Sequence, residues 1–126
     1  MIVTGGAGFI GSHLVDALIE QGNEVIIIDN ESGAASDRFY WNEKATHVKK
    51  CITDYEGTRP YYEGVDYVFH TAAKARIQTT VAAPIECTNT NLVGTTTVLQ
   101  CANEAGVKRV VYSSTSSAYG LKNEPP

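Results

Sequence analysis

Two kinds of apolar pattern alternate along the chain. Ile2–Thr4 is a short β-branched run that stops at a cluster of glycines, and from Phe9 onward apolar side chains recur every three or four residues. This spacing predicts a helix, which Gly22 ends because glycine adopts the left-handed conformation at a helix terminus. Glu24–Asp29 is an almost continuous apolar run, typical of a strand covered on both faces. The first 29 residues therefore predict a βαβ unit with parallel strands and a right-handed crossover.

The same alternation continues through the rest of the chain. Further strands are predicted at Thr46–Ile52, Tyr67–His70 and Arg109–Ser113. Helices are predicted at 37–43 and 56–63, both weak, and at 84–105, with a proline in its first turn and Gly106 after its end. Strands that alternate with helices specify an α/β fold, a doubly wound parallel sheet of about five strands. The expected strand order is 3-2-1-4-5, with the change of direction between the first and fourth strands.

Composition and charge exclude several classes of protein. The 126 residues are 43% hydrophobic and 19% charged, which is typical of one globular domain and not of a disordered tail or a coiled coil. The net charge of −4, without a cluster of Lys and Arg, argues against nucleic-acid binding. No apolar run approaches the ~20 residues that span a bilayer, and no basic leader precedes the first apolar stretch. We expect a cytoplasmic domain that binds neither nucleic acid nor membrane.

The cysteines and histidines do not indicate a metal or disulfide site. Cys51, Cys87 and Cys101 are far apart in the sequence and form no C-x-x-C pair, and the histidines are scattered as well. Small buried thiols in a reducing compartment are the favoured interpretation, so we expect no metal.

The glycine turn between the first strand and the first helix carries the strongest chemical signal. Gly5, Gly8 and Gly11 form G-x-x-G-x-x-G in the context that gives this motif a mechanism. The first glycine permits a tight turn, the second lets backbone approach a pyrophosphate, and the third lets the helix pack closely. The backbone amides of Gly8, Phe9 and Ile10 are expected to face the phosphates at the positive end of the helix dipole. A turn needed only for packing is the less favoured alternative.

An acid follows the turn at the distance expected for a dinucleotide site. Asp29 ends the second predicted strand 18 residues after Gly11, close to the roughly 20-residue offset of a carboxylate that binds the adenosine ribose. Such a carboxylate accepts from both ribose hydroxyls and repels a 2′-phosphate. The first arginine is Arg38, so NAD is favoured over NADP. An aspartate at a strand end is also a common turn former, which is the alternative.

Two further strand ends are predicted to face the same crevice. Asp54 and Tyr55 follow the third strand and are candidates to hold the adenine, with the carboxylate on its exocyclic amine. Thr71, Ala72 and Ala73 follow the fourth strand, where small residues let the backbone lie against a cofactor. Either segment alone is ordinary loop chemistry, but open α/β sheets bind ligands beyond the carboxyl ends of their strands.

Several motifs occur in the order and spacing of a known family. They are TGGAGFIGSHL at 4–14, Asp29-Asn30, HTAA at 70–73, NLVGT at 91–95, and YSST from 112 on through Tyr119-Gly120. With them the chain resembles the extended short-chain dehydrogenase/reductases, and among these the NAD-dependent nucleotide-sugar epimerases of the UDP-glucose 4-epimerase type. The resemblance covers essentially the whole chain and implies an NAD-binding Rossmann domain over 1–126.

The resemblance also implies roles for individual residues. It assigns the NAD pyrophosphate to the three glycines of the turn, the ribose to Asp29 and Asn30, and the adenine to Asp54 and Tyr55. It assigns Thr115 to the reacting hydroxyl of a UDP-hexose and Ser117 to the substrate wall. In the implied reaction a tyrosine takes the 4-OH proton while the C4 hydride passes to NAD, and the keto intermediate then receives the hydride on its other face. The composition of the segment 113–117, taken alone, favours a polar loop after the fifth strand.

The residues after Thr115 bear on the subtype. Related dehydratases typically carry an Asp-Glu pair there, and decarboxylating relatives typically keep a Glu at the second position. Ser116 and Ser117 occupy these positions here, which favours an epimerase.

The catalytic Tyr-x-x-x-Lys pair that the resemblance implies belongs beyond Pro126, as does a C-terminal substrate domain. Two hypotheses follow. The chain is the NAD-binding portion of an epimerase, or it is a stand-alone NAD-binding protein without catalysis. In both cases we expect the chain alone to be inactive, because it lacks the general base. We also expect an exposed fifth strand and helix 84–105 to support a homodimer or larger homo-oligomer.

Overall fold

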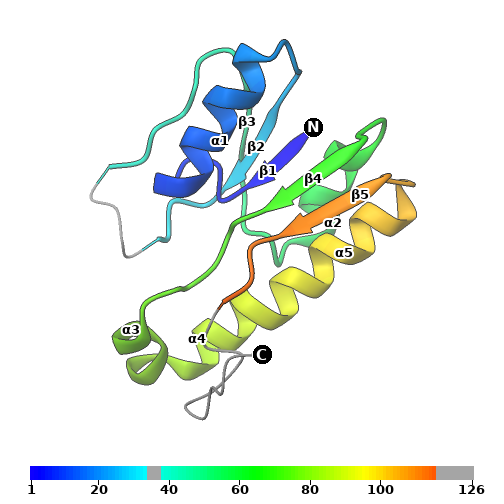
Figure 1. The fold of residues 1–126 in the computed structure, drawn as a ribbon. Coiled ribbons are helices and arrows are strands. Elements are labelled where there is room, and N and C mark those ends of the chain that lie inside the picture. The colour runs from blue at the N-terminus through cyan, green and yellow to red at the C-terminus, as the bar shows by residue number, and fades with distance from the viewer. Residues whose placement is uncertain (34–37, 116–126) are drawn as a thin grey trace, which may run out of the picture.

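A computed structural model describes residues 1–33 and 38–115, and these form five parallel strands with helices on both faces (Figure 1). The strands are β1 (Ile2–Thr4), β2 (Ile26–Asp29), β3 (Thr46–Lys49), β4 (Tyr67–His70) and β5 (Arg109–Tyr112). Their order is β3-β2-β1-β4-β5, with every neighbouring pair parallel, so the predicted doubly wound sheet and its order are confirmed. The order changes direction between β1 and β4, where such sheets bind ligands.

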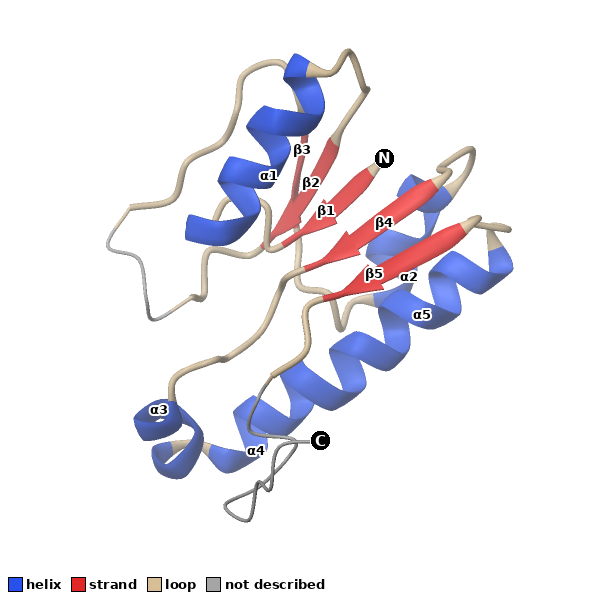
Figure 2. Ribbon diagram, in the orientation of Figure 1, coloured by secondary structure: helices blue, strands red, loops and turns tan. Residues whose placement is uncertain are grey.

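The helices pack on both faces of the sheet or lie beyond the carboxyl ends of its strands (Figure 2). They are α1 (Phe9–Glu20), α2 (Tyr55–Thr58), α3 (Ile77–Ala82), α4 (Pro84–Thr88) and α5 (Thr95–Glu104). Helix α1 covers one face, and α2 and α5 cover the other. A π-helical segment, Asn89–Gly94, joins α4 to α5 in one continuous helix whose first turns extend beyond the carboxyl ends of the strands.

The core follows from the two-residue period of the strands, which turns successive side chains to opposite faces. Ile2 and Ile28 pack with Val98 on the side of α5, whereas Val3 and Ile27 pack under α1. All of these side chains are buried, and burial of each contributes about 1.5–3 kcal/mol. The nearly unbroken apolar runs in the sequence are therefore explained by a sheet covered on both faces.

The predicted helix at 37–43 is wrong over its described part, because residues 38–43 form a loop. Tertiary contacts decide the conformation. The backbone amide of Tyr40 donates to the carbonyl of Ala7 at 3.0 Å, and the indole of Trp41 donates to the carboxylate of Glu31 at 2.9 Å. The aromatic run thus lies along the glycine turn and β2.

Two prolines set helix boundaries in the structure. The helix expected at 56–63 is split into α2 and a 3₁₀ turn, Arg59–Tyr62, at Pro60. Helix α3 was not predicted, and it is separated from α4 at Ala83. Ala83 precedes Pro84, and its φ of −135° and ψ of 64° are not helical.

Within the described ranges, no helix is long and apolar enough to cross a membrane.

Candidate functional site

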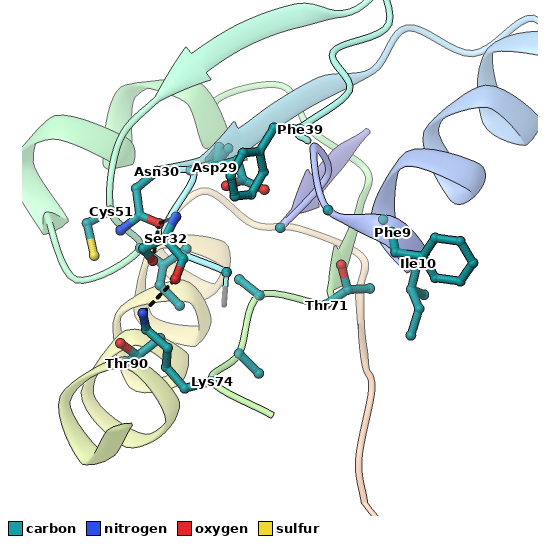
Figure 3. Close-up of a pocket in the computed structure, with 18 of the residues that line it drawn as sticks. Phe9, Ile10, Asp29, Asn30, Ser32, Phe39, Cys51, Thr71, Lys74 and Thr90 are labelled. Carbon is teal, nitrogen blue, oxygen red and sulfur yellow. Dashed lines mark hydrogen bonds between the residues drawn. The ribbon is translucent and has the colours of Figure 1, made fainter. Parts of the chain in front are cut away.

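A cavity of about 280 Å³ lies beyond the carboxyl ends of the central strands, between the start of α1 and the π-helical segment (Figure 3). Most of the predicted cofactor-binding residues line it: Gly5, Gly8, Phe9, Ile10, Gly11, Asp29, Asn30, Thr71, Ala72 and Ala73. The structure thus brings together the glycine turn, the acid at the end of β2 and the loop after β4. In Figure 3, Phe9 and Ile10 lie on the opposite side of the cavity from Asn30 and Lys74.

Two glycines of the turn are required by close backbone contacts. Gly5 has a φ of +69°, and a Cβ there would lie 2.8 Å from the Cα of Ala72 in the loop after β4. A Cβ on Gly11 would lie 2.1 Å from the carbonyl oxygen of Gly5. Gly8 is less constrained, since its φ is −79° and a Cβ would be 3.3 Å from the same oxygen. The turn, the start of α1 and the loop after β4 therefore pack backbone against backbone.

The first turn of α1 presents unused backbone donors to the cavity. The first hydrogen bond of the helix runs from the amide of Ser12 to the carbonyl of Gly8 at 2.9 Å, so the amides of Phe9, Ile10 and Gly11 have no acceptor within α1. The amide of Gly8 differs from the prediction, because it donates to the carbonyl of Gly5 at 3.1 Å. The anion-binding donors are therefore expected one residue further along.

Asp29 is buried, at 8% exposure, and both of its carboxylate oxygens are held by backbone amides. Oδ2 accepts from the amide of Ala7 at 3.1 Å, and Oδ1 accepts from the amide of Glu31 at 2.7 Å. Each oxygen retains capacity for a further hydrogen bond. Beside it, Asn30 Oδ1 accepts from both the amide and the hydroxyl of Ser32, at 3.2 and 2.6 Å. The cavity wall at the end of β2 is therefore polar and fixed.

The neighbouring lysine at the end of β3 is neutralised. Lys49 pairs in register with Asp29, but its ammonium group forms an ion pair with Glu31. The hydrogen bond from Lys49, followed by the one from Trp41, holds the pKa of the Glu31 carboxyl below its usual value. Glu31 also has a φ of +56°, which turns the chain sharply after Asp29. The cation nearest to Asp29 in the sheet thus already has a carboxylate partner.

Lys74 and Asn91 were not predicted as site residues, yet they fix one end of the cavity. Lys74 Nζ donates to the carbonyl of Ser32 at 2.7 Å and pairs with Glu86 at 2.9 Å, so its side chain spans from the loop after β4 to the loop after β2 (Figure 3). The Asn91 side chain holds the backbone of Lys74 at both groups, at 2.8 and 3.1 Å. The signal in the sequence was the lysine directly after Ala73 and the NLVGT motif.

Asp54 and Tyr55 do not appear among the described residues that line the cavity. The Asp54 carboxylate caps α2 by accepting from the amide of Gly57 at 2.9 Å, and this bond, with Lys50, lowers the pKa of Asp54. The Tyr55 hydroxyl donates to Glu104 at 2.5 Å. Because β3 ends at Lys49, earlier than predicted, the residues that reach the cavity there are Lys50, Cys51 and Ile52. The adenine role of Asp54 and Tyr55 stays a prediction without support from this geometry.

Of the predicted substrate residues, the structure describes Thr115 alone. Thr115 is exposed in the segment after β5 and is absent from the described lining residues. Ser116 and Ser117 lie outside the described residues. Across the described ranges no group of three or more His, Cys, Asp or Glu side chains is arranged to hold a metal ion.

Tyr40 and Lys44 have the spacing of a Tyr-x-x-x-Lys pair, but the structure gives them no such role. They lie in the loop before β3 rather than on a helix. Burial and the nearby Asp16 raise the pKa of the Tyr40 hydroxyl, whereas a tyrosine that acts as a base needs a lowered pKa. Neither residue lines the described cavity.

Comparison with known proteins places the chain in a family. The family model described as "NAD dependent epimerase/dehydratase family" matches residues 1–126. The chain belongs to this family. Among curated members of the epimerase/dehydratase family, a UDP-glucose 4-epimerase of Halalkalibacterium halodurans is 38% identical over 124 residues, which cover 95% of this chain and 36% of that protein. A UDP-N-acetyl-alpha-D-glucosaminuronate decarboxylase of Bacillus cytotoxicus is 39% identical over 129 residues, which cover 99% of this chain and 39% of that protein.

Solved structures of the family have the same fold. A UDP-glucose 4-epimerase of Thermotoga maritima with UDP-glucose matches 98% of this chain with a TM-score of 0.90 at 38% identity. A UDP-glucose 4-epimerase of Thermus thermophilus in complex with NAD matches 90% with a TM-score of 0.82 at 34% identity. The chain spans 40% and 37% of these two structures, so it corresponds to well under half of each.

Proposed function

We propose that this chain is the NAD-binding domain of a nucleotide-sugar epimerase. The observation that carries the proposal is the bond between Asp29 Oδ2 and the amide of Ala7, because it joins the predicted ribose acid to the predicted diphosphate turn in one cavity. Related structures in complex with NAD support the choice of cofactor.

The residues present fit an NAD dinucleotide. The amides of Phe9, Ile10 and Gly11 would hold the diphosphate at the positive end of α1. Asp29 and Asn30 would hold the adenosine ribose, since the buried carboxylate retains acceptor capacity toward two hydroxyls. A 2′-phosphate is disfavoured beside Asp29, and Lys49 is already paired with Glu31. NAD is therefore proposed over NADP.

The proposed reaction is inversion at C4 of a UDP-hexose. NAD supplies a hydride acceptor and donor when bound. The chain would orient it through the glycine turn and the backbone of the loop Thr71–Ala73, and Thr115 would donate a hydrogen bond to the sugar oxygen that becomes a carbonyl. Ser117 would line the substrate. The serines at 116 and 117 favour an epimerase, although the decarboxylase of Bacillus cytotoxicus is as similar in sequence as the epimerases.

Calorimetric titration with NAD and NADP tests the cofactor proposal directly. We expect heat of binding with NAD and weaker binding with NADP. Absence of any NAD binding, together with an unchanged titration for Asp29→Ala, would overturn the proposal. A second assay follows UDP-galactose formation from UDP-glucose. NAD binding without turnover supports the prediction that the chain alone is inactive, whereas measurable turnover contradicts that prediction.

We also propose that the chain assembles with a second copy through the helix that contains α4 and α5. Ile85, Leu92 and Leu99 lie along it and are 85%, 63% and 48% exposed. Exposed apolar side chains that gather along one helix are typical of a surface that contacts another protein. The open edge of β5 is the alternative surface.

A cytoplasmic location remains a prediction that rests on composition and on three cysteines that are free thiols.

A further inference from the structure

His70 is a buried titratable residue to which the proposed function gives no role. It ends β4, is 1% exposed, and lies between a threonine of β1 and a threonine of α5. Its Nδ1 is 2.6 Å from Thr4 Oγ1, and its Nε2 is 2.9 Å from Thr95 Oγ1. Burial lowers the pKa of His70 to about 4, so the ring is neutral at physiological pH.

The direction of these hydrogen bonds follows from the proton of one hydroxyl group. Thr95 Oγ1 donates its only proton to the carbonyl of Asn91 at 2.7 Å. The same oxygen must therefore accept from His70, which places the imidazole proton on Nε2. His70 Nδ1 is then an acceptor, and the Thr4 hydroxyl donates to it. Strand β1, strand β4 and α5 are linked by one chain of directed bonds.

Both ends of this series of hydrogen bonds reach the loop after β4 that lines the cavity. At one end, the backbone carbonyl of Thr4 accepts from the amide and the hydroxyl of Thr71, at 3.2 and 2.7 Å. At the other end, Asn91 binds the backbone of Lys74 through its side chain and accepts from Thr95 through its carbonyl. Strand β1 thus binds the start of the loop at Thr71, and the helix that contains Asn91 binds its end at Lys74.

The position of this loop matters to the cavity because it packs against the glycine turn. The backbone of Ala72 lies so close to Gly5 that a Cβ there would approach it to 2.8 Å. Any shift of the loop toward or away from the turn changes the width of the cavity between them.

We propose that His70 is a positioning residue that, as the neutral Nε2–H tautomer, sets the place of the loop 71–74 and with it the affinity of the cavity for a dinucleotide. The proposal rests on the proposed NAD site. A residue that only filled the core would be replaceable by an apolar ring of similar size, whereas a directed link requires an acceptor at Nδ1 and a donor at Nε2.

Variants of Thr95 test the link without emptying the core. Thr95→Val keeps the side-chain shape but removes the acceptor for Nε2 together with the hydrogen bond to the Asn91 carbonyl, and Thr95→Ser restores the hydroxyl. Thr96→Val is the matched control, because the Thr96 hydroxyl is exposed and binds only the carbonyl of Leu92 at 2.9 Å among the contacts described for it. His70→Phe removes both bonds of the ring. Each variant is examined by calorimetry with NAD and by hydrogen exchange of the Lys74 amide, and the variants that keep His70 are also examined by ¹⁵N NMR of its imidazole.

We expect the wild-type spectrum at neutral pH to show a protonated Nε2 and an unprotonated Nδ1. Thr95→Val is expected to weaken NAD binding about five- to tenfold, as for loss of one buried hydrogen bond, and to speed exchange at Lys74. Thr95→Ser and Thr96→Val should retain wild-type values. The opposite tautomer, or wild-type NAD affinity and Lys74 exchange in either Thr95→Val or His70→Phe, would overturn the proposal. If the wild type binds no NAD, the proposed function fails, while tautomer and exchange still decide the role of His70 in placing the loop.

Discussion

The carboxylate of Asp29 accepts a hydrogen bond from the backbone amide of Ala7 at 3.1 Å. The acid that ends β2 is thereby attached to the turn that leaves β1, and its other oxygen holds the amide of Glu31 at 2.7 Å. Two features that were predicted separately from the sequence are one rigid corner of the cavity. Asp29 therefore has a structural role in addition to its proposed contact with the ribose.

Replacement of Asp29 by Asn should destabilise the chain even without ligand. An amide has one acceptor oxygen, so in either orientation its NH₂ group faces the amide of Ala7 or that of Glu31. A buried donor left unsatisfied costs about 1–3 kcal/mol. Urea denaturation measures the loss. Asp54→Asn is the control, because Asn and Asp cap helices about equally well. Equal losses in the two variants would contradict the structural role of Asp29.

The fold was largely predictable because its signals are local. The apolar run over Glu24–Asp29 and the glycines between β1 and α1 determine a covered parallel strand and a tight crossover, whatever the rest of the chain does. The segment Phe39–Trp41 was not predictable in the same way. Its conformation depends on contacts with Ala7 and Glu31, which are distant in sequence and become neighbours only in the folded chain.

The site residues of the glycine turn and at the end of β2 could be predicted from the sequence. Residues whose assignment depends on the exact end of a strand could not. Asp54 and Tyr55 are predicted because they follow a strand expected to end at Ile52 and because the family resemblance assigns them the adenine, whereas β3 ends at Lys49. Strand ends are set by pairing with the neighbouring strand, here Asp29 with Lys49, and not by apolar character alone. Lys74 was missed because its interactions run across the cavity to a different loop.

Substitutions at two glycines should differ sharply in cost. A Cβ on Gly11 would lie 2.1 Å from the backbone carbonyl of Gly5, which cannot move without displacing the turn, whereas a Cβ on Gly8 would be 3.3 Å from the same atom. We expect Gly11→Ala to lower the free energy of unfolding by about 3 kcal/mol or more and Gly8→Ala by about 1 kcal/mol or less. Thermal denaturation of both variants measures the difference. Comparable midpoints would show that the turn tolerates a side chain at Gly11.

The buried His70 should make stability depend on pH in a defined window. The pKa of His70 is about 4 in the folded chain, whereas an unperturbed histidine, as in the unfolded chain, has a pKa of 6.5. Between these two pH values the unfolded chain therefore binds more protons than the folded chain. Stability is therefore full above about pH 6.5, falls as the pH is lowered toward about 4, and loses up to about 3 kcal/mol from this group. Carboxylates with lowered pKa values, such as Glu31, add a loss in the same direction only below about pH 4.5.

Urea denaturation between about pH 5 and 6.5 isolates the histidine, because the carboxylates remain ionised in that range. The wild type should lose stability as the pH falls through this range, and His70→Asn should be flatter, though less stable throughout. Parallel curves for the two proteins would show that His70 does not resist protonation in the folded chain.

Assembly through the helix that contains α4 and α5 predicts that one charge should dissociate the oligomer. Leu92 is 63% exposed between Ile85 and Leu99 on this helix, so Leu92→Glu should leave the fold intact while it places a charge in the proposed contact surface. Gln100→Glu adds the same charge on the same helix outside these three apolar positions. Sedimentation at micromolar concentration should show a dimer or larger assembly for the wild type and Gln100→Glu, and a monomer for Leu92→Glu. A monomeric wild type contradicts self-association, and an unchanged mass for Leu92→Glu moves the contact to the open edge of β5, where Val111 and Tyr112 are exposed.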